Sequence, residues 1–466
     1  MNSKIDHTSG VKVDMSNIGD ILELIPPDII EQFAYETNVD YRVKLLQGAV
    51  MFNMLLQLLI TNSKVSQRNA HEILTKGVSC LNPNIVPGRS VKDHTSITKR
   101  LATINCNFFE RIYDHVRDMI SPLYTSQELV GLHIIAVDST IVAETCNKLA
   151  EGFHIGNKSS DGSQRKHIKY TDAFDGLTVM GVAFNDDPTK QAENNALPQV
   201  IRDAAKRDPL HANLYVVDRG LTRAGTLAEF SGQAEGKDDA DKINFLVRIS
   251  DNRRLDVVSN FDCGQEEYDT EDGRHIKILE YGKVRIFKSA SAKPEKAEYL
   301  HVKAIVSTEV KDMDGKVLEK SEKVVNLLTD VEGLSAIEML EAYRMRWMVE
   351  VFFKFLKQNF DFSHIISTTA NGLKVMMYMT MIAAMLVLIY GKSRQIGFRR
   401  AKWEFDNDLQ KITIALLIIL LGGDPKDFMS SQNLRFPRWL LDSLPPKAHA
   451  LWEVITDYEQ VHACLT

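Results

Sequence analysis

Hydrophobic side chains recur with helical spacing over the first quarter of the chain. A period near 3.6 residues predicts amphipathic or buried helices. Pro26 and Pro27 fit the start of a helix, where a missing N–H is tolerated. We therefore expect a helical region over residues 1–125, with residues 1–19 as a loose polar tail. The runs that show this spacing are residues 20–37, 41–60, 65–78 and 94–120.

The period changes at Leu132, where residues 132–143 form a continuous apolar run with β-branched residues, typical of a buried strand. Next come two alternating runs joined by Asp175-Gly176, a strong hairpin signal. A helix, a second buried strand, a short helix and a fifth strand follow. The runs are residues 166–174 and 177–184 for the hairpin, then 196–206, 212–220, a helix from Thr222, and 243–250.

Residues 251–330 alternate with a period of two, which predicts short antiparallel strands. We interpret this stretch as an insertion into the preceding domain, because a helical pattern resumes after it; a separate β domain is the alternative. The expected strands are residues 275–281, 283–289, 298–308 and 322–330. The last hundred residues return to helical patterns, at residues 372–392, 406–423 and near 447–461.

The patterns together predict an α/β protein in five segments. They are a helical N-terminal region (1–125), the first part of a core (126–250), the β insertion (251–330), a core helix (331–370) and a helical C-terminal region (371–466).

The most informative helix is residues 341–360, for which Ser335 and Glu338 have the spacing of a capping box. One stripe of this helix carries a single carboxylate among cations and a tyrosine. The simplest interpretation is a solvated face with i,i+4 ion pairs. The stripe consists of Tyr343, Arg346, Glu350, Lys354 and Lys357.

The spacing Tyr343-x2-Arg346-x3-Glu350-x6-Lys357 resembles the signature of the DDE transposases of the IS4 family. Two aspartates strengthen the resemblance. Asp138 lies within the first buried strand and Asp218 at the end of the second. The order strand, hairpin, helix, strand, helix, strand is that of a ribonuclease-H-like domain. The resemblance implies that Asp138, Asp218 and Glu350 are its three acids.

The resemblance also implies roles for cations around these acids. In the family, residues at the positions of Tyr343, Arg346, Lys354 and Lys357 hold DNA, and an arginine occupies the position of Arg248 on the fifth strand. We expect Arg248 to contact DNA as well.

Three carboxylates suit phosphodiester chemistry with two Mg²⁺ ions, which bind hard oxygen ligands. Asp138 is the expected bridging ligand, with Asp218 and Glu350 holding one ion each. Mn²⁺ is expected to substitute for Mg²⁺.

Composition narrows these expectations. A net charge of −6 over 466 residues excludes DNA binding by bulk electrostatics and leaves local basic patches. Five scattered cysteines without a CxxC motif suit a reducing compartment.

The N-terminus has no signal-peptide pattern. The apolar runs 375–390 and 412–421 are too short for membrane spans and fit buried helices. We expect a cytoplasmic, nucleoid-associated protein that contacts no membrane.

Two basic segments are candidates for DNA contacts. Helices near 66–75 and 95–102 resemble a helix-turn-helix that would place Arg68, Lys99 and Arg100 on DNA; a plain helical bundle is nearly as good an interpretation. Residues 392–402 carry five basic side chains and no acid, either as a basic patch or as a solvated loop.

The family's best-known members hold a flipped base on a tryptophan of the β insertion. This chain has no tryptophan between residues 251 and 330, so Tyr281, Phe287 and Tyr299 are the possible replacements.

The sequence therefore predicts a DNA transposase that cleaves the ends of its insertion element and joins the 3′-hydroxyls to target DNA. Its partners would be double-stranded DNA and a second copy of the chain, since joining two ends requires at least a dimer. A metal-dependent nuclease of the same fold and a catalytically silent DNA-binding protein are the alternatives.

Overall fold

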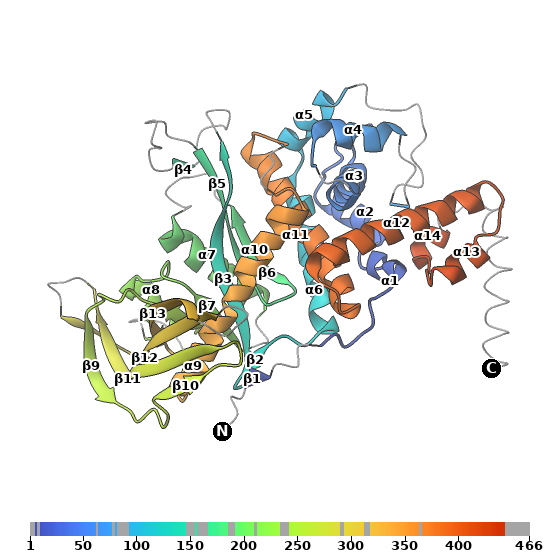
Figure 1. Cartoon of the computed structure of the whole chain (residues 1–466). Coiled ribbons are helices and arrows are strands. Elements are labelled where there is room, and N and C mark those ends of the chain that lie inside the picture. Colours follow the sequence, from blue (N-terminus) through green and yellow to red (C-terminus); the bar gives the residue numbers. More distant parts are fainter. Residues whose placement is uncertain are drawn as a thin grey trace. The chain divides into compact units, whose positions relative to one another are not determined.

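Figure 1 shows the computed structural model of the chain. It forms two compact units: residues 1–9, 126–141 and 168–352 make up unit 1, and residues 10–125, 142–167 and 353–466 make up unit 2. The structure describes residues 5–6, 10–61, 64–76, 80–81, 93–145, 154–155, 166–184, 192–208, 212–233, 242–288, 293–311, 317–362 and 366–442.

The centre of unit 1 is a sheet whose middle strands are parallel. Strand β7 (Asn213–Val217) lies between β3 (Leu132–Thr145) and β8 (Asn244–Arg248) and pairs with both in parallel. On the other side of β3 the sheet continues into the predicted hairpin, β5 (Lys166–Phe174) and β6 (Val179–Phe184). This confirms the expected strand order.

Helices cover both faces of this sheet. Successive side chains of a strand point to opposite faces, so both faces carry apolar side chains to bury. Side chains such as Ile135 and Tyr215 point to the face covered by α7 (Glu193–Arg207) and α8 (Ala224–Phe230). Ile134 and Leu214, one position earlier, point to the face covered by α9 (Ala336–Met345). The result is a mixed α/β fold with a ribonuclease-H-like core, as predicted.

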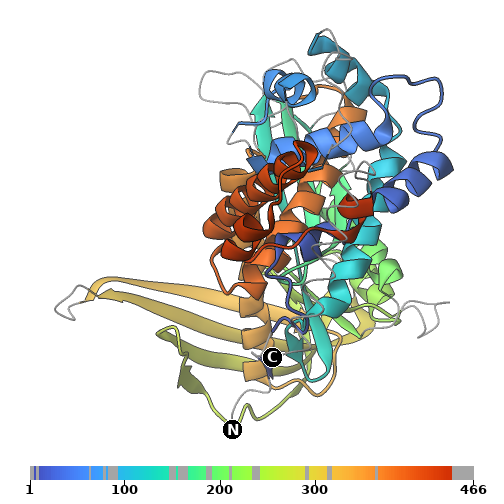
Figure 2. The same ribbon diagram turned by 90° about the vertical axis from the view of Figure 1, so that its right-hand side faces the viewer.

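The β insertion continues the same sheet. Strand β13 (Val317–Thr329) pairs antiparallel with β8. The next strands outward are β12 (Pro294–Lys311), β11 (Arg274–Phe287) and β10 (Glu267–Asp269), in that order. Strand β9 (Leu255–Asn260) also pairs with β11. Figure 2 shows the paired ends of β12 and β13 projecting beyond β11. The insertion is therefore part of the core sheet and not a separate domain.

The prediction of separate strands at residues 275–281 and 283–289 is wrong. Strand β11 runs from Arg274 to Phe287 across both predictions, with a register shift between Ile278 and Glu280 and no turn. Gly282 does not mark a turn; it allows close approach of β9, because a Cβ there would collide with the carbonyl of Ser259. Strands β9 and β10 have no counterpart among the predicted elements.

A tight turn leads into β3. Strand β2 (Glu128–Leu129) pairs antiparallel with its start, and the two connecting residues, Val130 and Gly131, both have positive φ, at 50° and 75°. On its other side β2 pairs with β1 (Ile5–Asp6).

Unit 2 is helical. Its central helix, α11 (Ala370–Ser393), packs against α3 (Gly48–Thr61), α5 (Thr95–Thr103), α6 (Cys106–Ile120) and α12 (Phe398–Leu420). Helix α11 is long and apolar enough to cross a membrane, but 89% of its most apolar window is buried inside the structure. It is a core helix, as predicted. The remaining described helices are α1 (Ile18–Leu22), α2 (Pro27–Glu36), α4 (Gln67–Lys76), α13 (Lys426–Ser431) and α14 (Arg438–Asp442).

The expectation of a loose tail is wrong for residues 15–19. Met15, Ile18 and Gly19 are buried, and Asn17 caps α1 by accepting from the Gly19 N–H while donating to the Asn433 carbonyl. The helix expected near 447–461 lies outside the described residues.

Candidate active site

The sheet of unit 1 places the two predicted aspartates next to each other. Asp138 and Asp218 directly follow Val137 and Val217, which are paired in the parallel register of β3 and β7. Both lie at even positions of their strands, on the face covered by α9. Arg248, the last residue of β8, has the same parity and lies on the same face.

Helix α9 and the helix after it, α10 (Trp347–Asn359), bring three more predicted residues to this face. The Tyr343 hydroxyl donates to Asp218 Oδ1 over 3.2 Å. The Arg346 guanidinium contacts Asp138 Oδ2 through Nη1 at 3.3 Å and Glu350 Oε1 through Nη2. The guanidinium thus connects two of the acids, and the phenol contacts the third.

The prediction of one continuous helix over 341–360 is wrong at Arg346. The chain makes a tighter turn there: the Arg346 N–H donates to the Tyr343 carbonyl and the Val349 N–H to the Arg346 carbonyl, over 3.1 and 3.2 Å. The two helices pack on different partners, because α9 covers the middle strands whereas Phe352 of α10 stacks on Phe174 of β5. The predicted capping box of Ser335 and Glu338 is confirmed.

The electrostatics of the site follow from this packing. Burial raises the pKa of Asp138 to about 6, and the negative charges of Glu350 and Asp218 act in the same direction. The Ser139 N–H and Arg346 oppose the shift. Burial, followed by the charge of Asp218, also raises the pKa of Tyr343, so the phenol stays protonated and able to donate.

Arg248 supports Tyr343. Its Nη2 donates to the Val324 carbonyl of β13 over 2.8 Å, and its guanidinium also hydrogen-bonds with Tyr343. Arg248 therefore connects the β insertion to the phenol that holds Asp218. The sequence predicted a DNA contact for this arginine but gave no sign of this support.

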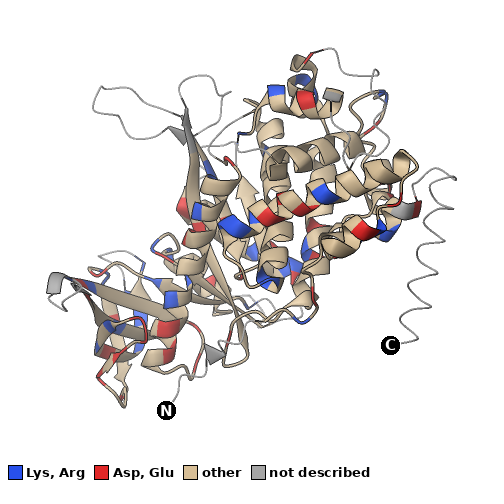
Figure 3. Ribbon diagram, turned by 45° about the vertical axis from the view of Figure 1, so that its right-hand side comes forward, with Lys and Arg blue, Asp and Glu red and all other residues tan. Residues whose placement is uncertain are grey.

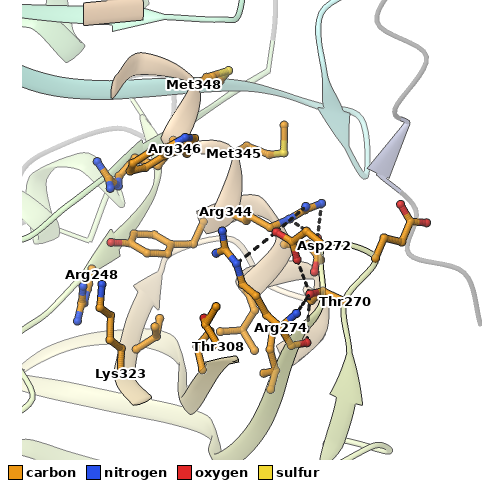
Figure 4. A pocket seen from close by; sticks show the side chains of 18 of the residues that line it. Arg248, Thr270, Asp272, Arg274, Thr308, Lys323, Arg344, Met345, Arg346 and Met348 are labelled. Atoms are coloured by element: carbon orange, nitrogen blue, oxygen red, sulfur yellow. Dashed lines mark hydrogen bonds and ion pairs between the residues drawn. The ribbon is translucent and has the colours of Figure 1, made fainter. Parts of the chain in front are cut away.

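A cleft of about 1010 Å³ opens beside these residues, between α9 and one face of the β insertion (Figure 4). In one part of it, Arg344 pairs with Glu341 at 2.9 Å and Arg274 with Asp272 at 3.2 Å. The other part holds Lys323, an exposed side chain on the strand next to Val324. Among the residues that the structure describes, Lys323 has no carboxylate partner. Sequence reasoning missed Lys323, because an alternating strand does not show which face borders a cleft.

Lys354 and Lys357 follow Glu350 by four and seven positions on α10 and belong to unit 2. Both residues are exposed. Partial desolvation by its neighbours lowers the pKa of Lys357.

The two predicted residues of α5 differ in their surroundings. Lys99 is exposed. The Arg100 guanidinium is only 13% exposed and donates to the carbonyls of Leu46 and Val39, over 3.0 and 2.6 Å. Arg100 therefore holds the segment between α2 and α3, a role that its sequence context did not indicate. Arg68, on α4, is exposed.

Residues 392–402 do not form an unneutralised basic patch. Arg394 pairs with Glu404 and Asp408, at 3.1 and 2.7 Å, and Arg400 pairs with Glu404. Lys402 is buried and donates to the Asn359 carbonyl. The acids come from the next turns of α12, and Figure 3 shows acidic and basic positions mixed along the helices of unit 2.

The aromatic candidates of the insertion are also constrained. Tyr299 is 1% exposed and its ring packs near Phe245, so it is not accessible to a base. Tyr281 donates to the Leu334 carbonyl, and Phe287 lies under the Arg254 guanidinium at 4.2 Å.

The acids suit a divalent metal by chemistry, since carboxylate oxygens are the ligands that Mg²⁺ and Mn²⁺ prefer. Burial is the main cause of the raised pKa of Asp138, and a cation bound beside it would offset the smaller contributions of Glu350 and Asp218. Within the described residues, no three His, Cys, Asp or Glu side chains are close enough to form a metal-binding group. Arg346, a cation, lies between Asp138 and Glu350.

The fold is a mixed α/β fold with a ribonuclease-H-like core, in which Asp138 and Asp218 directly follow paired residues of adjacent parallel strands and Glu350 lies on a later helix. The family described as the transposase DDE domain matches residues 131–386, more than half of the chain. The chain belongs to this family, which supports a transposase function. No curated protein sequence matches the chain.

Proposed function

We propose that the protein is a transposase of the IS4 type that cleaves the ends of its insertion element and joins them to target DNA. The adjacent placement of Asp138 and Asp218, bridged to the helix of Glu350, is the observation that carries the proposal. Family membership makes DNA the expected substrate.

The proposed reaction has two steps. Water attacks the phosphodiester at the element end, forms a new P–O bond and breaks the bond to the 3′ oxygen, which leaves as a 3′-hydroxyl after taking a proton. That 3′-hydroxyl then attacks a phosphodiester of the target strand and displaces the target's own 3′ oxygen. Both steps are phosphoryl transfers and need no oxidant or cofactor beyond divalent cations.

Asp138, Asp218 and Glu350 would hold the Mg²⁺ or Mn²⁺ ions that DDE transposases generally use. Such ions activate the attacking oxygen and stabilise charge on the leaving oxygen. Tyr343, held by Arg248, fixes the Asp218 carboxylate through its hydrogen bond. The contacts of α9 and α10 support this assignment, because Tyr343 of α9 donates to Asp218, while Glu350 of α10 pairs with the Arg346 guanidinium that also contacts Asp138.

DNA contacts are proposed for four cations of the predicted stripe and of the cleft. Arg346, Lys354 and Lys357 belong to the stripe predicted from the sequence, and Lys323 lies in the cleft beside Arg248. Each would neutralise a backbone phosphate and so position the strand without reading its sequence.

We further propose that residues 1–125 form a DNA-binding region, with the exposed Lys99 and Arg68 as its contacts. Arg100 would stabilise this region through its hydrogen bonds to the carbonyls of Leu46 and Val39. A dimer is proposed because two element ends must be joined together.

The test is incubation with DNA that carries both element ends, in Mg²⁺, scoring excised and joined products. The matched control is Glu350→Gln, which keeps the side-chain volume and removes the charge. Excision without joining would identify a nuclease of the same fold. DNA binding without any Asp138-dependent cleavage would identify a silent DNA-binding protein.

A further inference from the structure

Arg346 occupies the space between two of the proposed metal ligands. Its Nη1 lies 3.3 Å from Asp138 Oδ2, and its Nη2 contacts Glu350. The side chain is only 12% exposed, so it is part of the site's interior and not a surface contact. A guanidinium keeps its proton at any physiological pH, and this positive charge is therefore permanent.

The same guanidinium is incompletely satisfied. Its Nε is buried and has no hydrogen-bond partner within the part of the chain that the structure describes. A buried donor without a partner is destabilising. A phosphate would relieve this cost, because two of its oxygens match the guanidinium fork.

The backbone at Arg346 permits a change of partner. The residue lies at the break between α9 and α10, and its own N–H and carbonyl make i→i−3 bonds, not the regular bonds of either helix. Its side chain can rearrange without breaking a full turn of α9 or α10.

We propose that Arg346 is an internal counter-ion that competes with divalent cations for Asp138 and Glu350 in the DNA-free protein. A DNA phosphate draws the guanidinium away and leaves both carboxylates to the metal. Metal and DNA then bind cooperatively, and a free divalent ion is held weakly when no DNA is present. This inference rests on the proposed function, because it takes these acids to be metal ligands.

The size of the effect follows from linkage. Coupling between two ligands usually corresponds to about 5–150-fold in affinity, and each ligand changes the affinity for the other by the same factor. Removing Arg346 should therefore tighten Mn²⁺ binding at least about fivefold without DNA.

The experiment measures Mn²⁺ binding to the full-length, DNA-free protein by electron paramagnetic resonance titration. The variants are Arg346→Ala, the matched control Arg344→Ala, and Asp138→Asn. Arg344 also carries one positive charge in the same cleft, two positions away, but it pairs with Glu341 and Asp272 and not with the proposed ligands. Thermal unfolding of each variant checks that it is folded.

We expect tighter Mn²⁺ binding with Arg346→Ala, a change of less than about twofold with Arg344→Ala, and loss of the site with Asp138→Asn. A short DNA duplex should tighten Mn²⁺ binding more in the parent than in Arg346→Ala.

Two failures are distinguishable. Equal Mn²⁺ affinity of the Arg346 and Arg344 variants, at a site that still needs Asp138, overturns the competition and leaves the proposed function intact. Absence of any Asp138-dependent Mn²⁺ site in parent and variant overturns the proposed metal ligands and the competition with them.

Discussion

The Tyr343 hydroxyl donates a hydrogen bond to Asp218 across 125 positions of sequence, with the oxygen atoms 3.2 Å apart. This contact joins the helix that follows the β insertion to a residue next to β7, a strand that precedes the insertion. Arg248 hydrogen-bonds with the same phenol and with the backbone of β13. One tyrosine therefore joins the core strands, the insertion and the helix pair at the site.

Tyr343→Phe should keep the fold and slow DNA cleavage by about 10–100-fold, because a hydrogen bond to a charged group contributes about 1.5–3 kcal/mol. Cleavage rates on end DNA in Mg²⁺ measure this. Tyr268→Phe is the matched control, since the Tyr268 hydroxyl has no hydrogen-bond partner among the described residues. Equal rates for the two variants would show that the bond to Asp218 is not needed for the reaction.

Glu350→Gln, Asp138→Asn and Asp218→Asn should each abolish cleavage while retaining fold and DNA binding. The three act as one unit, so a double variant should be no worse than a single one. Cleavage and gel-shift assays on the same preparations separate the two properties. Parent-like cleavage by any one variant removes that residue from the catalytic set.

Lys323→Ala should weaken DNA binding and reduce its salt slope by about one unit, the contribution of one phosphate contact. Arg346→Ala and Lys357→Ala should do the same. Arg274→Ala is the control, because Arg274 lines the same cleft but is paired with Asp272. DNA affinity measured at several salt concentrations distinguishes a phosphate contact from a solvated side chain. If Lys323→Ala leaves the salt slope of binding unchanged, Lys323 is a solvated side chain.

Asp172 should make stability fall with rising pH. It lies in β5, fully buried, and neither carboxylate oxygen has a hydrogen-bond partner among the described residues. Burial raises the pKa of Asp172 well above its usual range. Since the folded-state pKa exceeds the unfolded value, the contribution of Asp172 to stability is complete below pH about 4 and is lost as the pH rises through the folded-state pKa.

Asp172→Val removes this titration and suits a buried strand. The variant should exceed the parent in unfolding free energy at pH 8 by about 1–3 kcal/mol, the cost of an unsatisfied buried polar group. The difference should shrink at pH 4.5. Asp172→Asn, which cannot ionise, should show the same trend. Thermal unfolding at both pH values measures the difference between variant and parent. A difference that is independent of pH would contradict the prediction that Asp172 titrates in the folded protein.

Val130→Asn should stabilise the protein by about 1 kcal/mol, because a left-handed conformation costs a non-glycine residue about 1–2 kcal/mol and Asn-Gly is the preferred pair in such hairpin turns. Val130 is 54% exposed, so little packing is lost. Urea unfolding measures the gain. Val257→Asn, at an exposed valine in strand β9, is the control and should give none.

The features that the sequence predicted correctly are encoded over short distances. The capping box of Ser335 and Glu338, the Asp175-Gly176 hairpin and the apolar strand around Asp138 each depend on a few neighbouring residues. The placement of Asp138 beside Asp218 then follows from the parallel pairing that this order of elements produces.

The features that it missed depend on residues distant in sequence. The break at Arg346 arises because α9 and α10 pack on different strands, and the role of Arg100 arises from carbonyls more than fifty positions earlier. Periodicity describes one element at a time and contains no information on such partners.

The position of the insertion also sets the order in which the site is synthesised. Asp218 precedes the insertion and Glu350 follows it, 132 positions later. At about 5–20 residues per second, the ribosome adds the third acid roughly 7–26 s after the second. During that interval the nascent chain carries both aspartates but lacks the carboxylate that completes the proposed site. The insertion, residues 251–330, accounts for most of this interval and so separates the synthesis of the core strands from the synthesis of the proposed third acid.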